Sequence, residues 1–109
     1  MFYLIAALAA ATSASPGITY LHCTAVRSDG PVAYDITLNE PASLVVWSGG
    51  GPARRQDAAQ FTANAVYFQY FKIDRTSLSM IREYPNMLGD GIETETGQCR
   101  KVVPAPRAF

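Results

Sequence analysis

The chain carries little charge and has no excess of either sign. Its 109 residues include nine basic and nine acidic side chains, which gives a formal net charge of zero at pH 7. An electrostatic field that attracts nucleic acid or an anionic membrane surface requires an excess of positive charge. We therefore expect no nucleic acid partner. Because 49% of the residues are apolar, we expect one folded globular domain rather than a disordered chain.

Histidine and cysteine are also scarce. His22 is the single histidine, and Cys23 and Cys99 are the two cysteines. A Ser/His/Asp or Cys/His mechanism would have to use His22, and a metal site built from these three residues would lack a fourth ligand. We accordingly expect no catalytic residues, no metal and no cofactor, with a small secreted enzyme as the third-ranked function.

Long apolar runs are absent except at the start of the chain, where residues 2–11 are all apolar. The run is shorter than the ~20 residues that span a bilayer. Small residues precede a predicted cleavage site after Ala14, so residues 1–14 are predicted to be a signal peptide. Unlike a typical signal peptide, the segment has no Lys or Arg before the apolar run. Residues 15–109 would then form a single domain in the periplasm or outside the cell, without a stable membrane span. The alternative is that the run is a strand or helix of the mature fold.

The two cysteines lie near opposite ends of the predicted mature chain. Export places them in an oxidising compartment, where the simplest expectation is a disulfide between Cys23 and Cys99. Closing so long a loop stabilises a domain by about 4 kcal/mol in the chain-entropy model. For a small domain, such a contribution could decide whether it stays folded.

Sustained helical periodicity is missing after residue 14, and short runs with strand composition take its place. Strands are expected over residues 18–26, 32–38, 44–47, 60–63, 65–73, 78–84 and 92–103, the last as a charged edge strand. This spacing predicts an all-β fold, a small antiparallel β-barrel or sandwich of about 6–8 strands closed by one disulfide. A bond between the first and last strands favours the barrel.

Residues 65–80 concentrate the large apolar side chains, and we expect them to form one β-hairpin with its tip at residues 75–77. Asp74 and Arg75 at this tip are typical of turn chemistry, in which a carboxylate bonds backbone amides and an arginine packs its stem on aromatic rings. The alternative is that Arg75 presents charge to a ligand together with Lys72. The aromatics of residues 67–71 and Trp47 could stack on bases or sugars, but burial in the core explains them more simply.

Three consecutive glycines precede two arginines in the one loop that the sequence predicts to be mobile. A mobile loop on a rigid β scaffold is a natural contact site. The possible partner-binding residues are Ser48, Gly49, Gly50, Arg54 and Arg55. The loop lacks the Lys and Ser or Thr of a phosphate-binding loop, and the alternative is that it simply connects two strands.

Four acidic residues near the end of the chain are Glu83, Asp90, Glu93 and Glu95. They could be imagined as a calcium site or an acid/base pair. Their spacing matches no calcium loop, and an alternating acidic edge strand is the expected explanation.

The segments YLHC, FKIDRTSLSM and GQC give the chain its resemblance to other proteins. They resemble a class of short, largely uncharacterised secreted proteins of Gram-negative bacteria. The residues that match this class are Ile73, Asp74, Arg75 and residues 97–99. The chain is also similar to periplasmic inhibitors of C-type lysozyme, whose inhibitory loop begins as Ser48, Gly49 and Gly50 do. The first resemblance implies no activity, and the second implies inhibition of a lysozyme-like hydrolase as the alternative function. From the sequence as a whole we expect an exported, non-enzymatic β domain with a binding or envelope-associated role, whose partner could be a protein in the periplasm or envelope.

Overall fold

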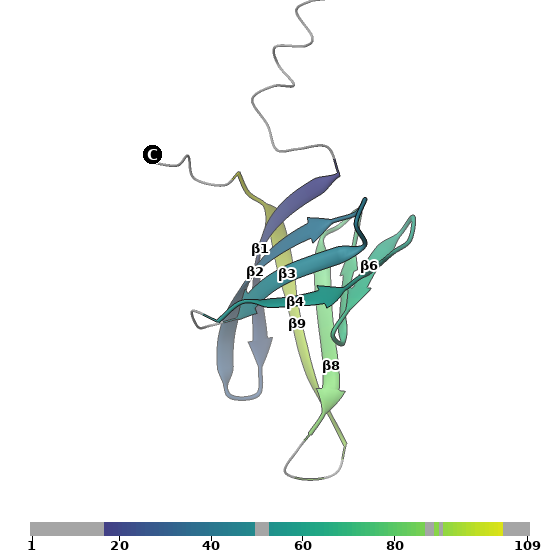
Figure 1. Ribbon diagram of the computed structural model, residues 1–109. Helices are drawn as coiled ribbons and strands as arrows, with labels where there is room; N and C mark the ends of the chain where they lie inside the picture. Colours follow the sequence, from purple (N-terminus) through teal and green to yellow (C-terminus); the bar gives the residue numbers. More distant parts are fainter. Residues whose placement is uncertain (1–16, 50–52, 87–88, 90, 104–109) are drawn as a thin grey trace, which may run out of the picture.

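The computed structural model describes residues 17–49, 53–86, 89 and 91–103. The predicted signal peptide, Gly50 and Asp90 lie outside these residues. The described part of the chain forms one antiparallel β-sheet and contains no helix. Figure 1 shows this sheet curled around a central core, with the β1–β2 and β8–β9 hairpins extending beyond the other strands at one end.

The sheet contains nine strands. They are β1 (Ile18–Arg27), β2 (Gly30–Asn39), β3 (Leu44–Gly49), β4 (Arg55–Ala58), β5 (Gln60–Phe61), β6 (Ala65–Phe68), β7 (Phe71–Asp74), β8 (Ser79–Pro85) and β9 (Ile92–Lys101). Their order in the sheet is β4-β3-β2-β1-β9-β8-β7-β6-β5. The two edge strands, β4 and β5, are consecutive in sequence, so the sheet is a nearly closed barrel. This confirms the all-β fold and the barrel arrangement.

The disulfide between Cys23 and Cys99 is confirmed. It joins β1 to β9, which are neighbours in the sheet, and the two cysteines lie directly opposite each other. Both side chains are buried. Although the residues are 76 positions apart, this bond ties the first strand of the chain to the last, in the middle of the sheet.

Successive residues of a strand point to opposite faces of the sheet, and the core consists of the residues that point inward. On β1 the alternation buries Leu21, Cys23 and Ala25, and on the neighbouring β2 it buries Tyr34, Ile36 and Leu38; Leu21 lies directly opposite Ile36, and Cys23 opposite Tyr34. Aromatic rings fill the rest of the interior: Phe71 contacts Trp47 edge-on at 5.2 Å between centroids and stacks with Phe68 at 4.7 Å. The predicted burial of Trp47 and Phe71 is therefore confirmed.

The prediction of a single hairpin over residues 65–80 is wrong in one respect. The segment turns at Arg75 as expected, but it also turns at Gln69 and Tyr70, which separate β6 from β7. Both residues have positive φ values, 41° and 69°, a conformation that glycine adopts more easily. The stacked Phe68 and Phe71 rings on either side of the turn offset part of this cost, and so the strand reverses without a glycine.

The loop predicted over Arg54, Arg55 and Asp57 is partly a strand. Residues 55–58 form β4, which pairs with β3, so the partner-binding loop is shorter than expected. This additional strand and the division of residues 65–73 explain why the strand count exceeds the expected 6–8.

The prediction that the last strand is an edge is wrong. β9 lies between β1 and β8 and pairs with both along most of its length. Gly97 allows the close approach to β1, because a Cβ at this position would clash with the carbonyl oxygen of Thr24 and lie 2.7 Å from Cα of Ala25. No helix of the described residues is long and apolar enough to cross a bilayer.

Candidate functional site

Asp74 and Arg75 lie at one end of the barrel, which we call the Arg75 end. The Asp74 carboxylate accepts hydrogen bonds of 2.8 Å from the backbone amides of Thr76 and Ser77, as expected for a turn. These bonds from Ser77 and Thr76 lower the pKa of Asp74 below its ordinary value. The role of Asp74 in the turn is thus confirmed.

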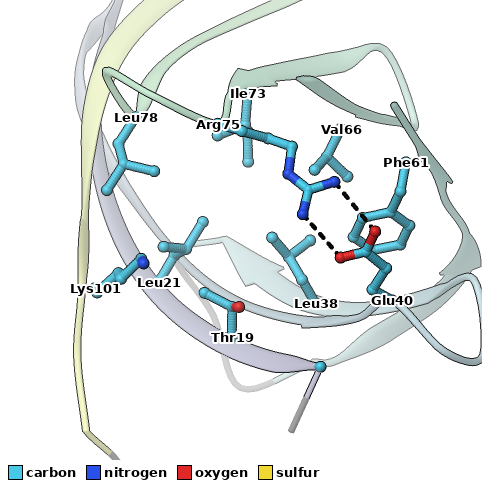
Figure 2. A pocket seen from close by; sticks show the side chains of 11 residues that line it. Thr19, Leu21, Leu38, Glu40, Phe61, Val66, Ile73, Arg75, Leu78 and Lys101 are labelled. Atoms are coloured by element: carbon cyan, nitrogen blue, oxygen red, sulfur yellow. Dashed lines mark hydrogen bonds and ion pairs between the residues drawn. The ribbon is translucent and has the colours of Figure 1, made fainter. Parts of the chain in front are cut away.

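Arg75 reaches across the end of the barrel from the β7–β8 turn to the β2–β3 turn. Its guanidinium donates to both carboxylate oxygens of Glu40, at 2.8 and 3.2 Å (Figure 2). It also donates to the carbonyl oxygen of Thr62 at 2.8 Å. It also lies over the Phe61 ring, 5.9 Å from the centroid. Lys72 is exposed on the outer face of β7 and does not line the cavity that Arg75 and Glu40 border at this end. Arg75 and Lys72 therefore do not form a joint charged site.

The predicted partner-binding loop lies at the opposite end, which we call the Arg55 end. Ser48 and Gly49 end β3, and Arg55 begins β4. The Arg55 guanidinium lies over the Trp47 ring at 5.4 Å, and the indole N–H of Trp47 donates to Asp57 at 2.8 Å. This chain of contacts fixes the position of the Arg55 side chain although the residue is exposed.

A cavity of about 240 Å³ opens at the Arg55 end. Its walls include three arginines, Arg27, Arg55 and Arg82, together with Tyr34 and Trp47. Ion pairs in the part of the chain that the structure describes involve Arg27 and Arg82, but neither Arg54 nor Arg55. Both guanidinium groups are exposed at this end, and Arg55 interacts electrostatically with the Asp57 carboxylate without forming an ion pair with it.

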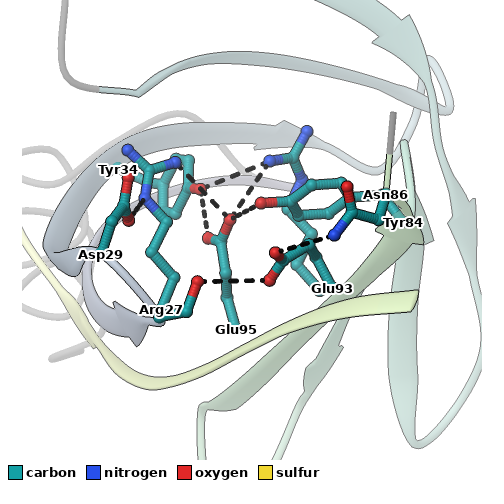
Figure 3. A network of polar contacts seen from close by, with 9 residues as sticks. Arg27, Asp29, Tyr34, Tyr84, Asn86, Glu93 and Glu95 are labelled. Atoms are coloured by element: carbon teal, nitrogen blue, oxygen red, sulfur yellow. Dashed lines mark hydrogen bonds and ion pairs between the residues drawn. The ribbon is translucent and has the colours of Figure 1, made fainter. Parts of the chain in front are cut away.

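Beneath this cavity lies a polar network that the sequence did not predict. The Glu95 carboxylate is completely buried and accepts hydrogen bonds from the hydroxyl groups of Tyr34 and, at 2.9 Å, Tyr84. Nη1 of Arg82 lies 3.6 Å from the carboxylate and Nη1 of Arg27 lies 3.8 Å from it (Figure 3). Two hydroxyl donors and two cations thus compensate the burial of one negative charge.

The network perturbs the tyrosines that bond Glu95. Burial, together with the hydrogen bond to Glu95, raises the pKa of Tyr34 from 10.0 to about 12. The same two causes raise the pKa of Tyr84. Both hydroxyl groups are donors at neutral pH, and the raised pKa values keep them donors at a higher pH than an ordinary tyrosine.

His22, Cys23 and Cys99, the residues that a catalytic or metal site would need, each have another partner in the fold. The Nδ1 atom of His22 lies 2.9 Å from an oxygen of the Asp35 carboxylate on the neighbouring strand, and both sulfurs of the cysteines form the disulfide. Across the described ranges, no group of three His, Cys, Asp or Glu side chains is arranged to hold a metal ion.

The acidic residues predicted to line one edge strand have separate environments. Glu83 is exposed on β8, whereas Glu93 accepts hydrogen bonds from Ser28 at 3.4 Å and from Asn86 at 3.3 Å. Glu95 contradicts the prediction, because it points into the core. A signal was present in the sequence: Glu95 and Cys99 are four positions apart on one strand, so an inward Cys99 places Glu95 on the same face.

Two tyrosines of the predicted aromatic core are exposed. Tyr67 is 40% exposed and Tyr70 is 59% exposed, and both line a shallow groove beside β6 and β7. Only part of the aromatic cluster of residues 67–71 therefore lies in the core.

Comparison of the chain with protein-family models, with curated proteins and with solved structures finds no match.

Proposed function

We propose that the chain is an exported, non-enzymatic binding protein that holds an acidic group of a protein partner at the Arg55 end. The observation that carries this proposal is the Arg55 guanidinium, which is exposed, stacked on Trp47 and outside the ion pairs of the described residues. A stacked arginine loses little side-chain entropy when it binds a carboxylate, because its plane is already oriented.

The rest of the Arg55 end supports a binding role. Gly49 lies against the Tyr34 ring, where a Cβ would be 2.6 Å from Cδ1, so the β3–β4 connection starts close to the barrel wall. Tyr34 is itself held by Glu95 and by an edge-on contact with Phe71 at 5.0 Å. Ser48 and Gly49, the last residues of β3, are therefore supported by a rigid part of the barrel.

Export and the lack of catalysis have their own supporting observations. A disulfide between neighbouring strands is typical of proteins that fold in an oxidising compartment. Because this bond engages both cysteines, neither offers a thiolate nucleophile. The domain therefore acts by contact with a periplasmic or envelope protein.

Site-specific photo-crosslinking in the periplasm tests this proposal. A photoreactive residue at Ser48 should yield an adduct with a discrete protein, and the matched position Thr24, exposed on β1, should not yield it. The adduct should disappear in the Arg54→Ala/Arg55→Ala variant and persist in Lys72→Ala. Identical adducts from both positions, or an adduct insensitive to the arginine substitutions, would show that this end is not the binding surface.

A second candidate partner is a lysozyme-like cell-wall hydrolase, which the exposed pair Arg54 and Arg55 favours. Such enzymes use two carboxyl groups in an open cleft, and a projecting guanidinium is complementary to them. The purified domain should then slow lysis of cell walls by a C-type lysozyme, and the Arg54→Ala/Arg55→Ala variant should not. If the wild-type domain has no effect at high molar excess, this candidate is excluded.

A further inference from the structure

The Arg75 end contains a second cavity, separate from the proposed partner-binding surface. It has a volume of about 170 Å³, and its deep walls are the buried side chains of Leu21, Leu38, Val66 and Ile73 (Figure 2). An apolar cavity of about 150 Å³ is large enough to bind a molecule such as benzene. The size and lining of this cavity therefore fit a small apolar body.

The rim of this cavity is charged. Glu40, Arg75 and Lys101 all line it, and the guanidinium of Arg75 is bonded to both oxygens of Glu40. Lys101, by contrast, takes part in no ion pair with another described residue. The rim thus has one unneutralised positive charge next to an apolar interior, which is complementary to a molecule with one negative charge.

Backbone strain marks the same cavity. Leu78, which lines the wall, has a φ of 62°, an unfavourable conformation for a bulky residue. It is held there by two hydrogen bonds: its amide donates to the carbonyl oxygen of Asp74 at 2.9 Å, and its carbonyl accepts from Cys99 at 2.8 Å. Strain that the surrounding structure maintains in this way is concentrated at ligand-binding sites.

From these three observations we propose that the cavity at the Arg75 end is a binding site for small monocarboxylates with an apolar body about the size of a benzene ring. The apolar body occupies the space between Leu38, Val66 and Ile73, and the carboxylate pairs with Lys101 at the rim. The Arg75–Glu40 pair closes the opposite side of the entrance. This site is independent of the partner-binding surface, so either can be present without the other.

Titration of the full chain with benzoate, followed by NMR, tests the proposal. Resonances of Leu38, Phe61 and Leu78 should shift in a saturable manner, with a dissociation constant of about 1 mM or lower. Benzylamine, which carries the opposite charge, should bind at least severalfold more weakly. Shifts that do not saturate, or that lie outside the cavity, would overturn the proposal.

Two variants separate the parts of the proposed site. Lys101→Gln should weaken benzoate binding severalfold but leave binding of the neutral benzyl alcohol unchanged, and Arg100→Gln, next to it on β9, should affect neither. Thr19→Trp, which places a large side chain at the half-buried edge of the cavity, should abolish binding of both molecules. If Lys101→Gln and Arg100→Gln have equal effects, or if Thr19→Trp still binds benzoate like the wild type, the assignment is wrong.

Discussion

Two glutamates, one at each end of the barrel, are paired with arginine in opposite ways. At the Arg75 end, Glu40 makes a bidentate pair with Arg75 at 2.8 and 3.2 Å, and the two side chains are 46% and 35% exposed. At the Arg55 end, Glu95 is 0% exposed, and its nearest arginine nitrogens are 3.6 and 3.8 Å away. The exposed pair has the shorter distances, whereas the buried carboxylate has the larger number of partners.

The difference teaches that distance alone does not measure what an ion pair contributes. Water competes for Glu40 and Arg75, and pairs in such surroundings contribute about 0–1 kcal/mol. Water does not reach Glu95, and removal of one member of a buried charged network costs about 3–5 kcal/mol, because it leaves the other charges uncompensated. We therefore expect the network with the longer ion pairs to matter more for stability.

The largest expected effect is that of Glu95→Ala. It removes the acceptor of both tyrosine hydroxyl groups and leaves Arg82, whose side chain is only 18% exposed, without its counter-charge. The free energy of unfolding, measured with urea, should fall by about 3 kcal/mol. Glu83→Ala, on the exposed face of β8, is the control and should change it by less than about 0.5 kcal/mol. Similar losses for the two variants would remove the distinction between the buried and exposed carboxylates.

The second effect is a loss of stability at alkaline pH that depends on Tyr34. The pKa of Tyr34 is raised from 10.0 to about 12, so between these values the unfolded chain loses this proton and the folded chain keeps it. Stability from this group is complete below pH 10 and decreases as the pH rises to 12, by at most about 2.7 kcal/mol. The difference in unfolding free energy between wild type and Tyr34→Phe should shrink over this range. A constant difference would mean that burial and Glu95 do not raise the pKa of Tyr34 in the folded protein.

The sequence predicted much of the fold because most strands obey simple alternation. The inward positions of β1 and β2 follow a period of two, and the two cysteines far apart in the sequence predicted the disulfide that joins β1 to β9. The turn at Gln69 and Tyr70 could not be predicted, because neither residue favours a positive φ. Besides the stacked Phe68 and Phe71 rings, its conformation depends on contacts outside the turn: the Gln69 side chain donates to Asp57 at 3.0 Å, and the carbonyl oxygen of Tyr70 accepts from the amide of Glu83 at 3.2 Å.

The candidate site was predicted only in part. The glycine and arginine pattern indicated the loop at the Arg55 end. The sequence alone, however, does not distinguish a charged residue on an exposed loop from a charged residue in the core. Glu95 was misassigned because glutamate is rarely buried, and its partners Tyr34, Arg82 and Arg27 come from three different strands. Only the register of β9 against β1 and β8 reveals that these side chains meet.

A smaller effect is expected from the exposed pair. Arg75→Gln should lower the unfolding free energy by about 1 kcal/mol or less, part of it from the lost hydrogen bond to the carbonyl of Thr62. A double-mutant cycle with Glu40→Gln isolates the pair, and its coupling energy should be below about 1 kcal/mol. A coupling energy of 2 kcal/mol or more would place this pair in the same class as the Glu95 network.

The smallest effect is the response of the two carboxylates to salt. At 1 M ionic strength the screening length is about 3 Å, so the coupling between Glu40 and Arg75 should fall towards zero as salt is raised. The penalty for Glu95→Ala should change much less, because ions do not enter the space between Glu95, Tyr34 and Tyr84. Measuring the double-mutant cycle and the Glu95→Ala penalty at low and high salt compares the two directly. If the coupling energy and the Glu95→Ala penalty decline equally, water and ions reach Glu95. Its ion pairs would then be screened by salt as much as the exposed pair of Glu40 and Arg75.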